Sequence, residues 1–87
     1  MAQLGLDTEH MTSLSKLMNE RASDIDSTIS KISTKLGNTW WKGNDAEKFR
    51  SEWGSTHKSN LKKVAAALRN VSKIIDNNKQ QQEQASR

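Results

Sequence analysis

Two long stripes of apolar side chains, one in each half of the chain, recur at intervals of three or four residues. The first stripe consists of Met11, Leu14, Met18, Ala22, Ile25, Ile29, Ile32 and Leu36. The second stripe consists of Ala46, Phe49, Trp53, His57, Leu61, Val64, Leu68, Val71 and Ile75. Such intervals keep side chains on one face of an α-helix. Because only residues 37–44 break the pattern, the sequence predicts an all-α fold, an antiparallel helix-turn-helix hairpin.

The residues that flank the stripes indicate where each helix begins and ends. Asp7 or Thr8 can cap the first helix, and Asn44 followed by Glu47 has the spacing of a capping box at the start of the second. Gly37 weakens the last turn of the first helix and could serve as its C-terminal cap in the left-handed conformation. The 87 residues then form one domain, with the first helix over about 7–38, the turn over about 39–44, the second helix over about 45–77 and a tail over about 78–87.

Polar residues within and beyond the helices add further expectations. The serines expected to face outward from the first helix are Ser13, Ser15, Ser23, Ser27, Ser30 and Ser33. Gly54 lies inside the second helix, where close approach of a neighbouring helix and simple tolerance are equally good explanations. Beyond Ile75 the chain is polar on all sides, and because an isolated polar helix end frays, we expect the tail to be mobile.

The hydrophobic content is small for a hairpin that folds alone. Only 32% of the residues are hydrophobic, and ordering each residue costs about 1.5 kcal/mol, which a single contact between two helices offsets with little margin. We therefore predict that two hairpins pair as a dimer into a four-helix bundle. The residues expected in its core or dimer interface are Leu14, Met18, Ile25, Ile29, Ile32, Leu36, Phe49, Trp53, Leu61, Val64, Leu68 and Val71.

The net charge of +4 is concentrated in the second half of the chain. Residues 1–37 contain four basic and five acidic side chains, whereas residues 44–87 contain nine basic and five acidic ones. A basic surface of this kind can bind nucleic acid. Here the longest basic run is Lys62-Lys63, and no aromatic residue outside the stripe alternates with the basic ones. We interpret them as a solvated helix face and expect no nucleic-acid partner.

The side chains that an active site or a metal site requires are scarce. The chain has no cysteine; of its two histidines, His10 lies near the start of the first helix, and His57 has no second ligand of suitable type at i+3 or i+4. Glycine-rich phosphate loops and acidic metal clusters are missing from the sequence. We therefore expect no enzyme activity, no metal and no cofactor. The first ten residues lack the basic and apolar regions of a cleavable signal peptide, and no apolar window approaches 18 residues, so we expect no membrane insertion.

The centre of the chain contains a spacing pattern formed by Trp41, Gly43, Ala46, Phe49 and Trp53. It resembles the small W-x-G helical-hairpin proteins exported by type VII secretion, the early-secreted-antigenic-target family of Gram-positive bacteria and actinobacteria. A W-x-G tripeptide alone is a weak signal. Its place in the middle of a short chain without cysteine, between two helical stripes, makes it specific, and the resemblance covers essentially the whole chain.

The resemblance implies a function in protein export. The protein would be made in the cytoplasm and secreted without a cleavable signal peptide, as a substrate, effector or effector partner of a type VII system. Its partners would be an identical chain or a paralogous W-x-G protein, together with the membrane ATPase. The turn residues Trp41, Lys42 and Gly43 would form part of the surface that the machinery recognises. In steric terms, Gly43 allows the reversal, and Trp41 can cover the open end of the hairpin.

One departure from the family concerns the tail. Family members often carry a tyrosine followed four residues later by an acidic residue, and this chain has no tyrosine. Lys79 and Glu83 keep the interval without the ring, so the export signal would come from a dimer partner or from a divergent tail. The alternative function is that of an intracellular helical adapter or a nucleic-acid-binding module that uses the basic second helix.

Overall fold

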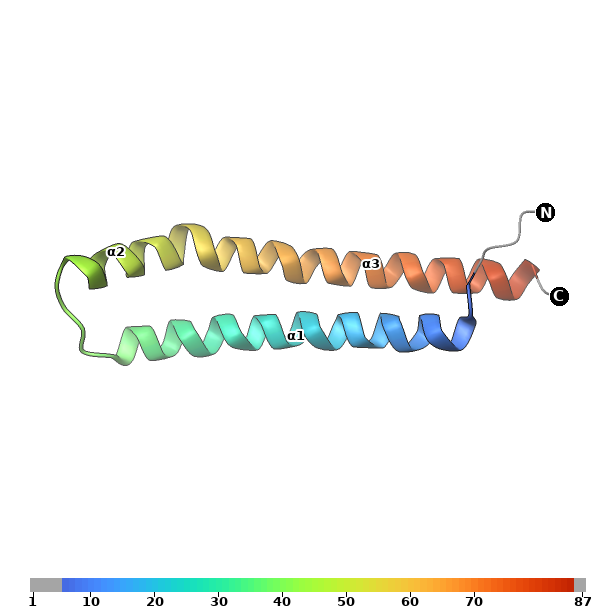
Figure 1. Cartoon of the computed structure of the whole chain (residues 1–87), viewed down its shortest axis with the longest axis horizontal. Helices are drawn as coiled ribbons and strands as arrows, with labels where there is room; N and C mark the ends of the chain where they lie inside the picture. The colour runs from blue at the N-terminus through green and yellow to red at the C-terminus, as the bar shows by residue number, and fades with distance from the viewer. Residues whose placement is uncertain (1–5, 86–87) are drawn as a thin grey trace.

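The protein folds as a long helical hairpin. The computed structural model describes residues 6–85, and between these residues the chain contains helices and one loop but no strand. The helices are α1 (Thr8–Asn38), α2 (Asn44–Glu52), the π-helical turn η1 (Trp53–His57) and α3 (Lys58–Ala85). Figure 1 shows α2, η1 and α3 as one continuous, gently bent rod that runs antiparallel to α1. The molecule measures 64 × 17 × 13 Å, and the predicted all-α hairpin is confirmed.

Asp7 caps the start of α1. Its backbone is extended (φ −100°, ψ 121°), and its carboxylate accepts a hydrogen bond of 3.0 Å from the His10 N–H. This hydrogen bond, more than any other contact, lowers the pKa of Asp7 below its usual value of 3.8. Glu9 adds negative charge in the first turn, where the helix dipole stabilises it. One of the two caps that the sequence offered is therefore used.

The expected caps at the turn are wrong at both helix ends. α1 continues through Gly37 to Asn38, and the extended residue Thr39 ends it. Gly43, not Asn44, is the N-cap of α2, and no side chain caps this end. The positive φ of 119° at Gly43 explains the difference: glycine adopts this conformation most easily, so the helix begins immediately after it.

The seam between α1 and the rod opposite it is built mainly from small side chains. The buried residues in the described part of the chain are Ser15, Ala22, Ile29, Ala46, Trp53, Ala65, Ser72 and Ile75. Alanine and serine let helix backbones approach closely but bury little apolar surface. The hairpin is therefore held by a narrow seam, with a limited hydrophobic contribution.

The expectation that Ser15 and Ser33 face outward is also wrong. Ser15 is buried, and its hydroxyl lies 2.6 Å from the hydroxyl of Ser72 in α3. Asn19 donates to the same Ser72 hydroxyl at 2.8 Å. Ser33 is half-buried and accepts a hydrogen bond of 3.0 Å from the Trp53 indole N–H. These serines were misplaced because a polar residue can lie on the buried face of a helix when a partner satisfies its hydroxyl.

The π-helical turn η1 changes the phase of the second stripe. The Lys58 N–H donates to the carbonyl oxygen of Trp53, five residues earlier, so the turn contains one residue more than an α-helical turn. As a result His57, expected on the stripe, is exposed, and Lys58 is half-buried instead. A Cβ built on Gly54, which lies in η1, has no atom within 4 Å. Within the hairpin, no close helix approach explains this glycine.

The polar end of the chain is helical for longer than expected. The boundary near residue 77 is wrong, because α3 continues to Ala85 through most of the expected tail. The Lys79 ammonium donates to the Thr12 hydroxyl of α1 at 3.0 Å, which ties this end of α3 to the start of α1. Residues 86 and 87 of the expected tail lie outside the described residues.

Candidate functional site

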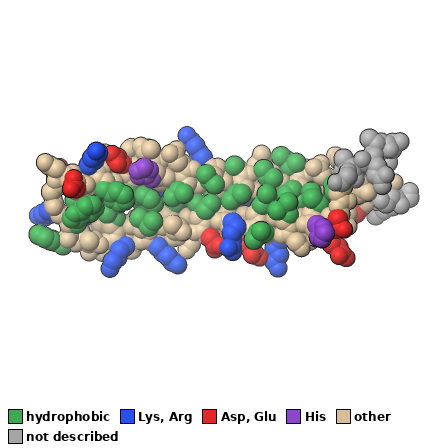
Figure 2. Space-filling model, in the orientation of Figure 1, with side chains coloured by type: hydrophobic (Ala, Val, Ile, Leu, Met, Phe, Trp, Pro, Cys, Tyr) green, Lys and Arg blue, Asp and Glu red, His purple; other side chains and the backbone are tan. Residues whose placement is uncertain are grey.

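Many of the apolar side chains predicted as core remain exposed on the single hairpin. We define the apolar face by Leu14, Met18, Ile25, Ile32, Phe49, Val64, Leu68 and Val71. Helical spacing places those from α1 on one side of that helix and those from α3 on the matching side of the other. Figure 2 shows apolar side chains as a band along nearly the whole length of the hairpin.

The twelve predicted core or interface residues fall into three groups. Ile29 and Trp53 are buried in the seam. The half-buried residues are Met18, Ile25, Leu36, Leu61 and Leu68. The exposed residues are Leu14, Ile32, Phe49, Val64 and Val71. The single hairpin therefore covers only part of the predicted core, and its apolar face lies open along both helices.

The loop between α1 and α2 contains Trp41, Lys42 and Gly43, and Gly43 ends it. Its φ of 119° and ψ of 177° belong to a region that is essentially restricted to glycine. A Cβ built there would have no atom within 4 Å, so the backbone conformation, and not space, requires the glycine. The Gly43 carbonyl accepts from the Glu47 N–H at 3.1 Å and so starts α2.

The side chain of Arg50 holds the loop in place from α2. Its guanidinium donates to the carbonyl oxygens of Trp41 at 2.7 Å, Thr39 at 3.0 Å and Leu36 at 3.4 Å. The last turn of a helix has carbonyls without intrahelical partners, and Leu36 is one of these. A second one, that of Lys35, accepts from the Thr39 hydroxyl at 2.6 Å. Arg50 therefore fixes both the end of α1 and the path of the chain across the turn.

Three aromatic rings form a ladder beside the turn. The rings of Trp41 and Phe49 are tilted at a centroid distance of 6.1 Å, and those of Phe49 and Trp53 are stacked at 6.4 Å. The Arg50 guanidinium lies 5.9 Å from the centre of the Trp41 ring, within the range of a cation–π contact. Trp41 is thus held between α2 and the loop, although 40% of its surface stays exposed.

Trp40 has a very different environment from its neighbour. It is 84% exposed, and its indole ring makes none of the aromatic contacts seen for Trp41 in the described part of the chain. Of the two adjacent tryptophans in the loop, Trp41 is therefore anchored and Trp40 is free. Lys42, which follows them, is exposed as well.

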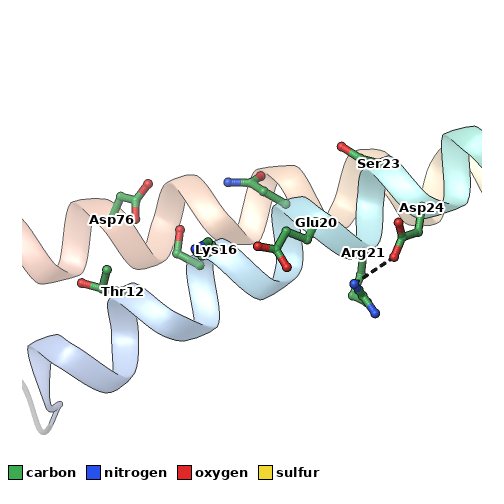
Figure 3. A pocket seen from close by; sticks show the side chains of 9 residues that line it. Thr12, Lys16, Glu20, Arg21, Ser23, Asp24 and Asp76 are labelled. Atoms are coloured by element: carbon green, nitrogen blue, oxygen red, sulfur yellow. Dashed lines mark ion pairs between the residues drawn. The ribbon is translucent and has the colours of Figure 1, made fainter.

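A shallow polar groove runs along the other side of the seam. Figure 3 shows Thr12, Lys16 and Glu20 on α1 and Asp76 on the neighbouring α3. Farther along α1, Arg21 and Asp24 form an exposed ion pair of 2.9 Å. Basic and acidic side chains alternate along this groove, so their charges largely offset one another. The groove therefore presents no cluster of a single charge sign.

The described residues contain no group of three or more metal-ligating side chains. None of the helices between residues 6 and 85 is long and apolar enough to cross a membrane. Lys79 and Glu83, the expected remnant of a tail signal, lie one helical turn apart in α3. The two residues belong to the end of the hairpin opposite the turn.

Two features of the turn could not be predicted from the sequence. Arg50 reads as an ordinary basic residue of a helix, and its role depends on three carbonyls that only the folded turn brings together. That Trp40 is the more exposed of the two adjacent tryptophans could likewise not be predicted. The tandem of Trp40 and Trp41 shortly before Gly43 was the available signal.

Comparison with protein-family models, curated proteins and solved structures found no match to this chain.

Proposed function

We propose that this chain is a small secreted W-x-G protein, a substrate, effector or effector partner of a type VII secretion system. It is made in the cytoplasm, leaves the cell without a cleavable signal peptide and acts through dimerisation and recognition by other proteins. Its partners are a second hairpin, identical or paralogous, and the membrane ATPase of the system. Catalysis, cofactors and nucleic acid have no part in this function.

The observation that carries the proposal is the construction of the turn. Trp41, Lys42 and Gly43 form the exposed reversal between two long helices, with Gly43 at a positive φ and Trp41 held against Phe49 and Arg50. A loop of this kind costs little to order on binding, because Arg50 has already fixed its path. It is suited to recognition by a secretion machine that binds folded substrates.

The open apolar face supports the dimer. Leu14, Ile32, Val64 and Val71 are exposed along its length, and the seam itself buries mostly alanine and serine. A contiguous apolar band of this length is typical of an interface. Pairing two hairpins face to face would bury it in a four-helix bundle, the arrangement that stabilises amphipathic helices of this length. Of the basic residues of α3, Arg69 does not favour the alternative, because it pairs with Asp26 at 2.6 Å across the seam.

Export can be tested directly. The full chain is expressed in a bacterium with a complete type VII system and in the same strain with the membrane ATPase deleted. We expect the protein in the culture supernatant of the first strain and only in the cells of the second, while a cytoplasmic marker stays in the cells of both. Equal amounts in the two supernatants would contradict the proposal. Retention in both strains, with binding to nucleic acid in cell extracts, would favour the alternative module.

A further inference from the structure

The free tryptophan of the turn is an unusual feature of this surface. Trp40 is 84% exposed, whereas the adjacent Trp41 is 40% exposed and Trp53 is 8% exposed. Indole is among the largest apolar groups a protein can expose. The hairpin buries two of its three tryptophans at least in part and leaves this one in solvent.

The loop around Trp40 is held from both sides. The carbonyl of the preceding residue, Thr39, and that of the following residue, Trp41, both accept hydrogen bonds from the same Arg50 guanidinium. The backbone that carries Trp40 is therefore fixed, while its side chain is exposed to solvent. A rigidly presented aromatic side chain is what an interface hot spot requires, because little conformational entropy is lost when it binds.

The charges near Trp40 indicate the kind of surface it fits. Lys35 and Lys42 are exposed and form no ion pair within residues 6–85. Asp45 and Glu47 lie in the first turn of α2, also exposed. An anionic bilayer would repel these two carboxylates. A protein pocket can instead be apolar at its centre and carry carboxylates opposite the lysines.

We propose that Trp40, presented by Arg50, is the anchor that inserts into an apolar pocket with an acidic rim on the protein that recognises the turn. This inference rests on the proposed export function and adds Trp40 to the recognition surface that Trp41, Lys42 and Gly43 form. Insertion would bury the indole ring and leave its N–H to donate to an acceptor in the pocket, as buried tryptophans usually do. Lys42, two residues further on, would then face the carboxylates of the rim.

The test compares Trp40→Ser, Trp40→Phe and the control Lys48→Ser in the full chain. Each variant is expressed in the strains with and without the membrane ATPase, and the secreted-to-cellular ratio is measured. We expect Trp40→Ser to lower the ratio about tenfold or more, the effect of losing one hot-spot aromatic. Trp40→Phe should retain most of the export, because a ring still fills the pocket, and Lys48→Ser should export as the wild type does.

The possible outcomes separate this inference from the export function. If the wild type is exported without the ATPase, both are wrong. If the wild type requires the ATPase and Trp40→Ser is exported equally well, only the assignment to Trp40 is overturned. A fall in the melting temperature of Trp40→Ser would also contradict the proposal, because it would show that the ring packs against the hairpin. Trp40-dependent flotation of the purified protein with phosphatidylglycerol vesicles would assign the surface to a membrane instead.

Discussion

The hydroxyl of Ser15 in α1 lies 2.6 Å from the hydroxyl of Ser72 in α3, and both side chains are buried in the seam of the hairpin. Ser72 also donates to the Ser15 carbonyl at 3.3 Å and accepts from Asn19. Sliding α1 past α3 by one turn would leave these polar groups buried without partners, which is costly. The serine pair thus fixes the register of a seam whose other buried residues, within residues 6–85, are three alanines, two isoleucines and Trp53.

Replacing one serine of this pair is expected to lower the free energy of unfolding by more than the loss of its own hydrogen bonds would. Ser72→Ala should lower the free energy of unfolding by about 1–3 kcal/mol, because the Ser15 hydroxyl stays buried and loses its best partner. The double variant Ser15→Ala/Ser72→Ala should cost clearly less than the sum of the two single variants. Urea denaturation of all four proteins at one concentration measures this coupling. Strict additivity would show that the two hydroxyls do not depend on each other.

A second prediction concerns the hold of Arg50 on the turn. Arg50→Ala removes three donors to carbonyl oxygens, so we expect hydrogen exchange in residues 39–44 to speed up and the free energy of unfolding to fall by about 1–2 kcal/mol. The matched control is Lys48→Ala, an exposed basic residue of the same helix with no such contacts. It should leave both quantities unchanged. Equal exchange rates in the two variants would mean that the loop keeps its path without Arg50.

A third prediction is that alanine substitutions at Gly43 and Gly37 change the stability of the hairpin in opposite directions. Gly43→Ala should destabilise the hairpin by about 1–3 kcal/mol, because alanine is strained at a φ of 119°. Gly37→Ala should stabilise it by about 0.5–1 kcal/mol, since Gly37 lies within α1 and a Cβ there has no atom within 4 Å. Thermal unfolding of both variants tests the assignment. A destabilised Gly37→Ala would restore the helix-capping role that the sequence suggested.

The helices and the position of the turn could be predicted from the sequence because apolar spacing is a local signal that recurs many times along each stripe. The phase of the second stripe after Trp53 could not be predicted. A π-helical turn inserts one residue there, and the spacing of the apolar residues does not reveal it. His57 therefore lies outside the stripe that was expected to contain it. Arg50 and Ser15 were missed for a related reason. Arg50 acts through backbone carbonyls of the loop and of α1, and Ser15 acts through groups of α3. A single sequence does not say which polar residues will find such partners.

The dimer leads to a fourth prediction, on the apolar face. Val64 is exposed on the hairpin, so Val64→Asp should leave the helical content of the chain intact but place a charge in the proposed interface. We expect sedimentation equilibrium to show a dimer of about twice 9.8 kDa for the wild type and a monomer for the variant. If the wild type pairs with a paralogous hairpin instead, the variant should no longer bind that partner.

The control for this prediction is Ala66→Asp, which adds the same charge at an exposed position of α3 away from the apolar face. It should stay as associated as the wild type. A wild-type chain that remains a stable, cooperatively melting monomer at micromolar concentration, with or without a paralogous hairpin, would contradict the four-helix bundle.

The central claim is that the turn is a surface for recognition as well as a structural element, and one secretion measurement separates the two. Trp41→Ala is compared with a variant of the buried residue Ile29, either Ile29→Val or Ile29→Ala, chosen to have the same melting temperature. We predict that Trp41→Ala stays folded and dimeric in the cell and lowers the secreted-to-cellular ratio about tenfold or more, while the Ile29 variant is still exported. Indistinguishable ratios for the two variants would contradict the recognition role and leave Trp41 as a packing residue alone.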